Sequence, residues 1–262
     1  MTTDHSMVVL PHARLAGGPR TLLVLEGLTL ENKAPTGRAL RLLRWAYKRY
    51  LPGFTVYQVA RRPGLAAGAT TRDMAGDYAR WARGKLDGPV DVIGFSTGGE
   101  IAQYLAADHG QLVRKLVLSD TGCRLGEDAK ALLRAARDKA ARGRAAEAQA
   151  DIAAHIDFGR LGGGLVRLLG KRMLKEPGDP TDYIATLEAD LAHDATEALP
   201  RINAPTLMIG GTRDFFYPEP IVRETAERIP DATLRLYEGV GHSVGKTQKR
   251  RFEGDVLGFL HS

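Results

Sequence analysis

The sequence has 262 residues, of which 44% are hydrophobic and 26% are charged, with a formal net charge of +6. These values fit one large α/β domain, or a core with one insertion, that buries a sizeable core without disulfides or metal ions. The single cysteine, Cys123, excludes an intrachain disulfide framework and a cysteine-rich zinc site, and it favours a reducing, cytoplasmic setting.

The amino-terminal residues carry no recognisable targeting signal. Residues 1–6 contain no basic segment that leads into an apolar stretch, and no run of about 18 apolar residues occurs in the sequence. We therefore expect a soluble, cytoplasmic protein that is not processed and has no membrane span.

The first half of the chain predicts alternating strands and helices. Apolar and β-branched runs predict strands at residues 7–15 (a strand or a hairpin), 21–25, 54–59, 89–93 and 112–118. A basic amphipathic helix is expected at 38–50, and a second helix begins at Thr70 or Thr71. Its buried face is expected to carry Met74, Tyr78, Trp81 and Leu86. This alternation indicates a mostly parallel sheet with helices on both faces.

The pattern changes between residues 122 and 199. This segment is rich in alanine and charged residues, has no convincing strand, and contains the helix breakers Gly162-Gly163-Gly164 and Pro177-Gly178-Asp179-Pro180. It predicts a helical cap on a core formed by residues 1–121 and 200–262, and an elongated crossover without a role at the site is the alternative. Strands at 205–209 and 232–237, a helix at 221–229 and a last helix with Phe252, Val256, Phe259 and Leu260 on one face then complete the core.

A serine lies between a predicted strand and a predicted helix, in the motif Gly94-Phe95-Ser96-Thr97-Gly98. The spacing G-x-S-x-G is typical of a tight turn that exposes a serine hydroxyl, because residues two positions away must lack a Cβ atom to avoid a collision. The turn also leaves the first N–H groups of the helix free to donate to an oxyanion. A structural glycine turn is the alternative, and no phosphate-binding motif is present.

An activated serine requires an imidazole base and a carboxylate that orients it. Asp214 follows the predicted strand at 205–209, and His242 follows the strand at 232–237. Because the carboxyl ends of parallel strands border one crevice, Ser96, Asp214 and His242 are expected to meet there. Asp120, after the strand at 112–118, is the competing acid.

The whole chain resembles the α/β-hydrolase superfamily, because these motifs occur in that family's order, Ser96, Asp214 and His242. The resemblance is to members that have a helical cap inserted after the sixth strand. The resemblance implies a catalytic triad of these residues and an oxyanion hole formed by the N–H groups of Thr97 and Leu28. Many relatives have His-Gly where this chain has Glu26-Gly27. Glu26 could restrict anionic substrates or orient a water molecule, but we expect instead a structural hydrogen bond, with its carboxylate pointing away from the oxyanion.

The remaining candidate groups suggest no second chemistry. No metal-binding motif occurs, so neither a metal nor another cofactor is expected, and Cys123 is expected to pack in the core. Two basic clusters match no nucleic-acid recognition motif, and we interpret them as solvated helix faces rather than a nucleic-acid site. The clusters are Arg38, Arg41, Arg44, Lys48 and Arg49, and Lys246, Lys249, Arg250 and Arg251.

Together these features predict a serine hydrolase that acts on a small or medium, uncharged carboxylic ester through an acyl-enzyme. Phe95, Phe215 and Phe216 are expected to line an apolar substrate pocket. The resemblance leaves two alternatives, a C–C bond hydrolase or other triad-based activity, and a non-catalytic small-molecule receptor. The expected partner is a small-molecule substrate, for a monomer or a homo-oligomer.

Overall fold

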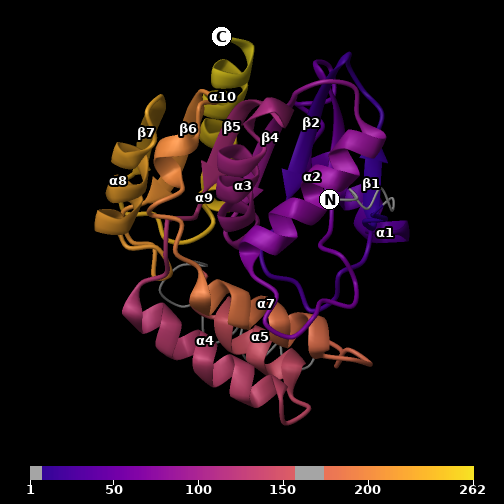
Figure 1. The fold of residues 1–262 in the computed structure, drawn as a ribbon, viewed down its shortest axis with the longest axis vertical. Coiled ribbons are helices and arrows are strands. Elements are labelled where there is room, and N and C mark those ends of the chain that lie inside the picture. Colours follow the sequence, from indigo (N-terminus) through magenta and orange to yellow (C-terminus); the bar gives the residue numbers. More distant parts are fainter. Residues whose placement is uncertain (1–7, 157–173) are drawn as a thin grey trace, which may run out of the picture.

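A single twisted sheet forms the centre of the molecule (Figure 1). The computed structural model describes residues 8–156 and 174–262, and within them seven strands pair in the order β1-β3-β2-β4-β5-β6-β7. Only β1 is antiparallel to its neighbour. The strands are β1 (His12–Leu15), β2 (Arg20–Leu25), β3 (Phe54–Val59), β4 (Val90–Phe95), β5 (Val113–Ser119), β6 (Thr206–Gly211) and β7 (Ala232–Tyr237).

The first strand does not form a hairpin with the second. His12–Leu15 pairs with β3 at the edge of the sheet, so a hairpin at residues 7–15 was the wrong alternative. Residues 1–7 lie outside the described part of the chain.

Alternate residues of the central strands face opposite layers of helices. Leu23 and Leu25 of β2 pack in the core that includes helices α2, α3 and α8, whereas Leu22 and Val24 pack in the core that includes α10. Both sides are therefore buried, as the near-continuous apolar strands predicted. The main-body helices are α1 (Gly37–Ala46), α2 (Thr71–Lys85), α3 (Thr97–Asp108), α8 (Glu219–Arg228), α9 (Val244–Thr247) and α10 (Lys249–His261), with short 3-10 turns at Gly110–Leu112 and Leu199–Arg201.

Three further helices lie together at one end of the sheet (Figure 1). They are α4 (Glu127–Ala140), α5 (Ala145–Ala153) and α7 (Thr181–Ala192). They lie between β5, which corresponds to the strand predicted at 112–118, and β6. We propose that the segment 122–199 acts as a cap; its glycine triplet, 162–164, lies outside the described residues.

The helix α1 is shorter than the helix expected at 38–50, and most of its apolar residues are exposed. It ends at Ala46, and none of its residues is buried. Leu42 and Trp45 remain 68% and 59% exposed. By contrast, α2 begins as expected, because Thr70 accepts a hydrogen bond from the Asp73 N–H and forms a capping box with it.

Candidate active site

The serine turn has the geometry that its glycines require. Ser96 connects β4 to α3 with φ +52° and ψ −124°, a conformation that non-glycine residues seldom adopt. A Cβ atom on Gly98 would lie 2.3 Å from the Leu25 carbonyl oxygen, and one on Gly94 would lie 2.6 Å from the Gly98 carbonyl oxygen. The expected steric reason for both glycines therefore holds.

The structure brings the three candidate triad residues together at the carboxyl ends of their strands. Ser96 Oγ lies 3.1 Å from His242 Nε2, and His242 Nδ1 lies 2.8 Å from Asp214 Oδ2. Because an ionised carboxylate can only accept, Nδ1 carries the proton and Nε2 is free to accept from Ser96. The other oxygen of Asp214 accepts from the N–H groups of Phe216 and Tyr217, which fixes the acid loop.

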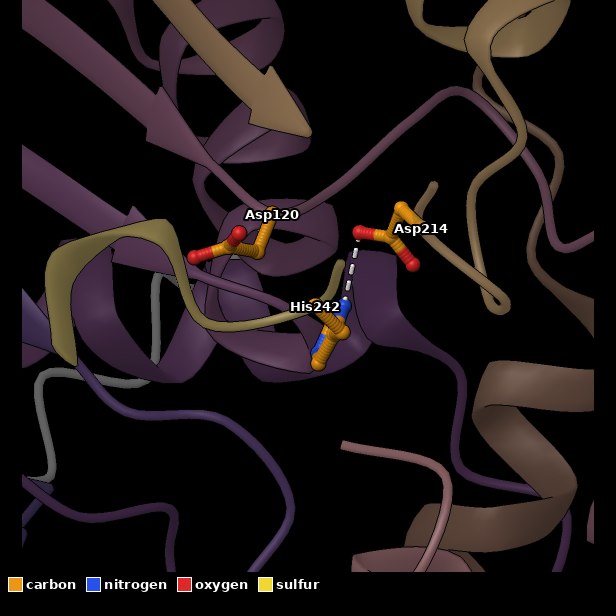
Figure 2. Close-up of side chains that lie close together, drawn as sticks. All are labelled: Asp120, Asp214 and His242. Carbon is orange, nitrogen blue, oxygen red and sulfur yellow. Dashed lines mark hydrogen bonds and ion pairs between the residues drawn. The ribbon is translucent and has the colours of Figure 1, made fainter. Parts of the chain in front are cut away.

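Asp120, the competing acid, is not hydrogen-bonded to the imidazole of His242 (Figure 2). It supports the histidine loop, which is the loop after β7 that carries His242. Its Oδ1 accepts from the N–H groups of Ser243 and Val244, each at 3.1 Å, and its Oδ2 accepts from the Ser119 hydroxyl. Potential ligand atoms of Asp120, Asp214 and His242 lie within 4.8 Å of one another, as in a metal site. Their oxygens are already engaged by N–H and O–H donors, which argues for loop positioning rather than metal ligation.

The pKa of His242 reflects two opposing influences. Burial lowers it, but the charge and hydrogen bond of Asp214, together with the charge of Asp120, raise it above the usual value overall. Lys246 acts in the opposite direction to the two carboxylates. Both acids therefore favour the imidazolium form of His242.

The loop after β2 lies beside the serine. A Cβ atom on Gly27 would lie 3.3 Å from the Ser96 Cβ atom, so glycine permits this approach. Leu28 and Thr97, the expected oxyanion-hole residues, both line the cavity above Ser96. Their N–H roles remain our proposal.

A buried guanidinium holds this loop in place. Arg61, which is only 2% exposed, donates to the carbonyl oxygens of Glu26 and Gly27 at 3.2 and 3.0 Å, and to the Thr29 hydroxyl at 2.8 Å. Arg61 lies two residues after the end of β3. Sequence reasoning missed this residue; the available signal was an arginine just beyond the carboxyl end of a predicted strand.

The structural hydrogen bond expected of the Glu26 side chain is not found among the described residues. No hydrogen bond of its carboxylate is recorded within residues 8–156 and 174–262, and the residue lines the same cavity as Ser96. Burial raises its pKa, against the lowering influence of Arg61 and Lys246. The main-chain carbonyl of Glu26, rather than its side chain, anchors the loop.

The cavity beside the triad has a volume of about 420 Å³. Phe95 and Phe216 line it, whereas Phe215 is not among the described residues that line it, so the substrate-binding role of Phe215 stays a prediction without support from this cavity. The two hydrogen bonds to Asp214 fix a turn in which Phe216 packs 4.7 Å from the His242 ring, while Phe215 packs 4.6 Å from the His155 ring. The other apolar lining residues on the cap side are Leu125, Leu133, Ile152 and Ile156.

The two basic clusters meet at the opposite side of the cavity. Lys249 donates to the Ala46 carbonyl oxygen, and the Trp45 ring lies 5.6 Å from both Lys48 and Lys249. Ala46, Lys246 and Lys249 line the cavity. The clusters are thus largely exposed helix faces, as expected, but they form one basic edge beside the site. In the described part of the chain, no helix has the length and apolar composition needed to cross a bilayer.

The family model for the alpha/beta hydrolase fold matches residues 44–247. The chain belongs to this family. This alpha/beta hydrolase-fold protein is 32% identical over 183 residues to polyketide synthase ThaQ of Burkholderia thailandensis, covering 66% of this chain and 9% of that protein. It is 31% identical over 176 residues to a pimeloyl-[acyl-carrier protein] methyl ester esterase of Neisseria meningitidis, covering 61% and 64% respectively. The alignments therefore span less than two thirds of each relative.

A solved enol-lactonase from Burkholderia xenovorans LB400 has the same fold. Its TM-score is 0.79 at 20% identity, with 97% of this chain and 96% of the lactonase covered. Seven paired strands with a serine turn after β4 agree with this assignment.

Replacement of Arg61 by lysine tests the anchoring of the loop. Lysine keeps the charge but cannot span three acceptors with a planar fork, so we expect the kcat of ester hydrolysis to fall by about ten- to a hundredfold. Steady-state kinetics measure this loss. The matched control is Arg62→Lys, whose partner is Asp77 rather than the loop. Equal kinetics for the two variants would contradict the role of Arg61.

The pH dependence of the reaction tests the electrostatics of His242. A base acts only when neutral, so the rate should rise with pH through the raised pKa of His242. Asp120→Asn retains one acceptor oxygen, for the N–H groups of Ser243 and Val244, but removes a charge that raises this pKa, so the acidic limb of kcat/KM should move to lower pH. The exposed Asp231→Asn serves as control. A limb that stays in place in Asp120→Asn would show that Asp120 does not act on His242.

Proposed function

We propose that this protein is a serine hydrolase that cleaves a small or medium, uncharged carboxylic ester through an acyl-enzyme. The hydrogen-bonded series Ser96–His242–Asp214 at the edge of an apolar cavity carries this proposal. Similarity to an enzyme named as a methyl ester esterase supports ester chemistry.

In the first half-reaction, His242 Nε2 takes the proton of Ser96 as Oγ attacks the acyl carbon. Asp214 holds the Nδ1 proton and stabilises the imidazolium that forms. The N–H groups of Thr97 and Leu28 stabilise the negative oxygen of the tetrahedral intermediate. His242 then returns the proton to the leaving alcohol as the carbon–oxygen bond breaks.

In the second half-reaction, His242 takes a proton from water, whose oxygen attacks the acyl carbon. The second intermediate releases Ser96 and the carboxylic acid, and His242 returns the proton to Ser96 Oγ. No redox step or cofactor enters this balance.

The cavity supports an apolar acyl group of limited size. A volume of about 420 Å³ lies at the lower end of the range for small-molecule sites. We propose that Leu133, Ile152 and Phe216 contact the acyl chain beneath the cap, which makes an uncharged ester the favoured substrate.

Two other functions use the same residues. A C–C bond hydrolase would turn over a vinylogous diketone well and simple esters weakly. A non-catalytic receptor would be stabilised thermally by a ligand without turnover. The hydrogen-bonded serine favours an enzyme over a receptor, because a receptor does not require an activated nucleophile.

Replacement of Ser96 by alanine tests the proposed nucleophile. Hydrolysis of short- and medium-chain p-nitrophenyl esters should fall by at least about a thousandfold, because a cooperating set of residues loses its central member. The melting temperature should change little, because alanine keeps the Cβ atom and leaves the backbone of the turn as it is. Ser262→Ala, at the carboxyl end of α10, provides the same chemical change away from the cavity. Full activity in Ser96→Ala would contradict the nucleophile assignment.

A further inference from the structure

A second buried polar network lies directly behind the serine turn. Glu100, in the first turn of α3, is fully buried, and Asp190 of the cap helix α7 is only 3% exposed. The Tyr217 hydroxyl donates to Glu100 Oε1 at 2.8 Å. The Thr97 hydroxyl donates to Asp190 Oδ2 at 2.7 Å. Two acidic side chains from separate elements are thus held side by side, away from water.

The remaining oxygen of each acid has no ordinary donor. Glu100 Oε2 and Asp190 Oδ1 are buried, and neither receives a hydrogen bond from an N–H or O–H group of the described residues. The two side chains lie near enough for each to shift the pKa of the other, by charge and as a potential hydrogen-bond partner. Since two ionised carboxylates can only accept, a proton on one of them would satisfy both of these buried oxygens.

Burial is the main reason that the proton remains. It raises the pKa of Glu100 well above its usual value, and the neighbouring Asp190 raises it further. Burial also raises the pKa of Asp190 to about 6, while the hydrogen bonds from Thr97 and Glu100 lower it. The proton of the pair is therefore favoured on Glu100 rather than on Asp190.

We propose that Glu100 and Asp190 share one proton, and that this pair is a positioning device that joins the cap to the serine turn and the acid loop. This inference rests on the proposed roles of Ser96 and Thr97. Through Asp190 the pair holds Thr97, whose N–H is the proposed oxyanion donor. Through Glu100 it holds Tyr217, whose own N–H donates to Asp214 and whose ring stacks 5.9 Å from that of His242.

The neighbouring charged and hydroxyl groups of the described residues do not supply the hydrogen bond that the shared proton would make. Arg61, behind the oxyanion loop, lowers the pKa of Asp190 by its charge but donates its recorded hydrogen bonds elsewhere. Tyr104 on α3 and Tyr183 on α7 also interact electrostatically with the pair. The Tyr183 hydroxyl is itself buried with no recorded partner among the described residues, so it is not a donor to either acid.

Loss of the shared proton should weaken the contact of the cap with the serine turn and the acid loop. A raised acid pKa stabilises the folded state below the usual pKa, and this contribution disappears as the pH rises through the folded-state value. Above that value, two buried negative charges face each other across the contact between cap and serine turn. Both kcat and the melting temperature should then decline on the alkaline side.

Glu100→Gln is the decisive variant. Its amide can donate permanently to Asp190 and accept from Tyr217, but it cannot lose a proton. The wild-type kcat should fall about tenfold for each pH unit above the pKa of the pair. In Glu100→Gln, kcat relative to its own value at neutral pH should stay within about twofold over the same range, and the alkaline fall in melting temperature should be smaller. Glu188→Gln, an exposed change on α7, is the control and should follow the wild type.

Two measurements separate this inference from the proposed function. The melting temperature against pH is also recorded in Ser96→Ala, where no turnover is needed. Infrared difference spectra at neutral pH should show one protonated carboxyl group in the wild type that is missing in Glu100→Gln. Retention of that band, or identical alkaline melting curves in the wild type and Glu100→Gln, would overturn the shared proton, whatever the substrate proves to be.

Discussion

The backbone of Ser96 is held at φ +52°, a conformation that costs of order 1–3 kcal/mol for a residue with a side chain. Several separate parts of the fold are arranged around this turn. The Ser96 N–H donates to the Ser119 carbonyl of β5, and Gly98 packs against the main chain that follows β2. Asp120 and Ser243, which support the histidine loop, also have positive φ values. The strained residues therefore lie together, where three strand ends meet.

Buried charges set the geometry around the turn. Arg61 fixes the proposed oxyanion loop through its carbonyl oxygens, Asp214 fixes the tautomer of His242, and the Glu100–Asp190 pair connects the proposed cap. Each of these groups is expensive to bury alone, so each is retained only with specific partners. The cap thus contributes to the positions of the proposed catalytic groups as well as to the wall of the cavity.

The sequence predicted the sheet, the serine turn and the convergence of Ser96, Asp214 and His242, because each residue lies at or just beyond the carboxyl end of a predicted strand. It could not predict that Phe216 rather than Phe215 lines the cavity, since that depends on the turn fixed by Asp214. The roles of Arg61 and Glu26 were also missed, because they depend on contacts between segments about 35 residues apart. The exposed α1 shows that an amphipathic pattern does not by itself ensure burial.

The most direct test of the central claim is labelling with a fluorophosphonate, followed by peptide mapping of the adduct. The reagent reacts only where a serine is activated by a base and its phosphoryl oxygen is stabilised by an oxyanion hole. This account predicts one adduct, on Ser96, which is lost in His242→Ala although the serine remains. An unlabelled protein, or an adduct on another residue, would contradict the assembled active site.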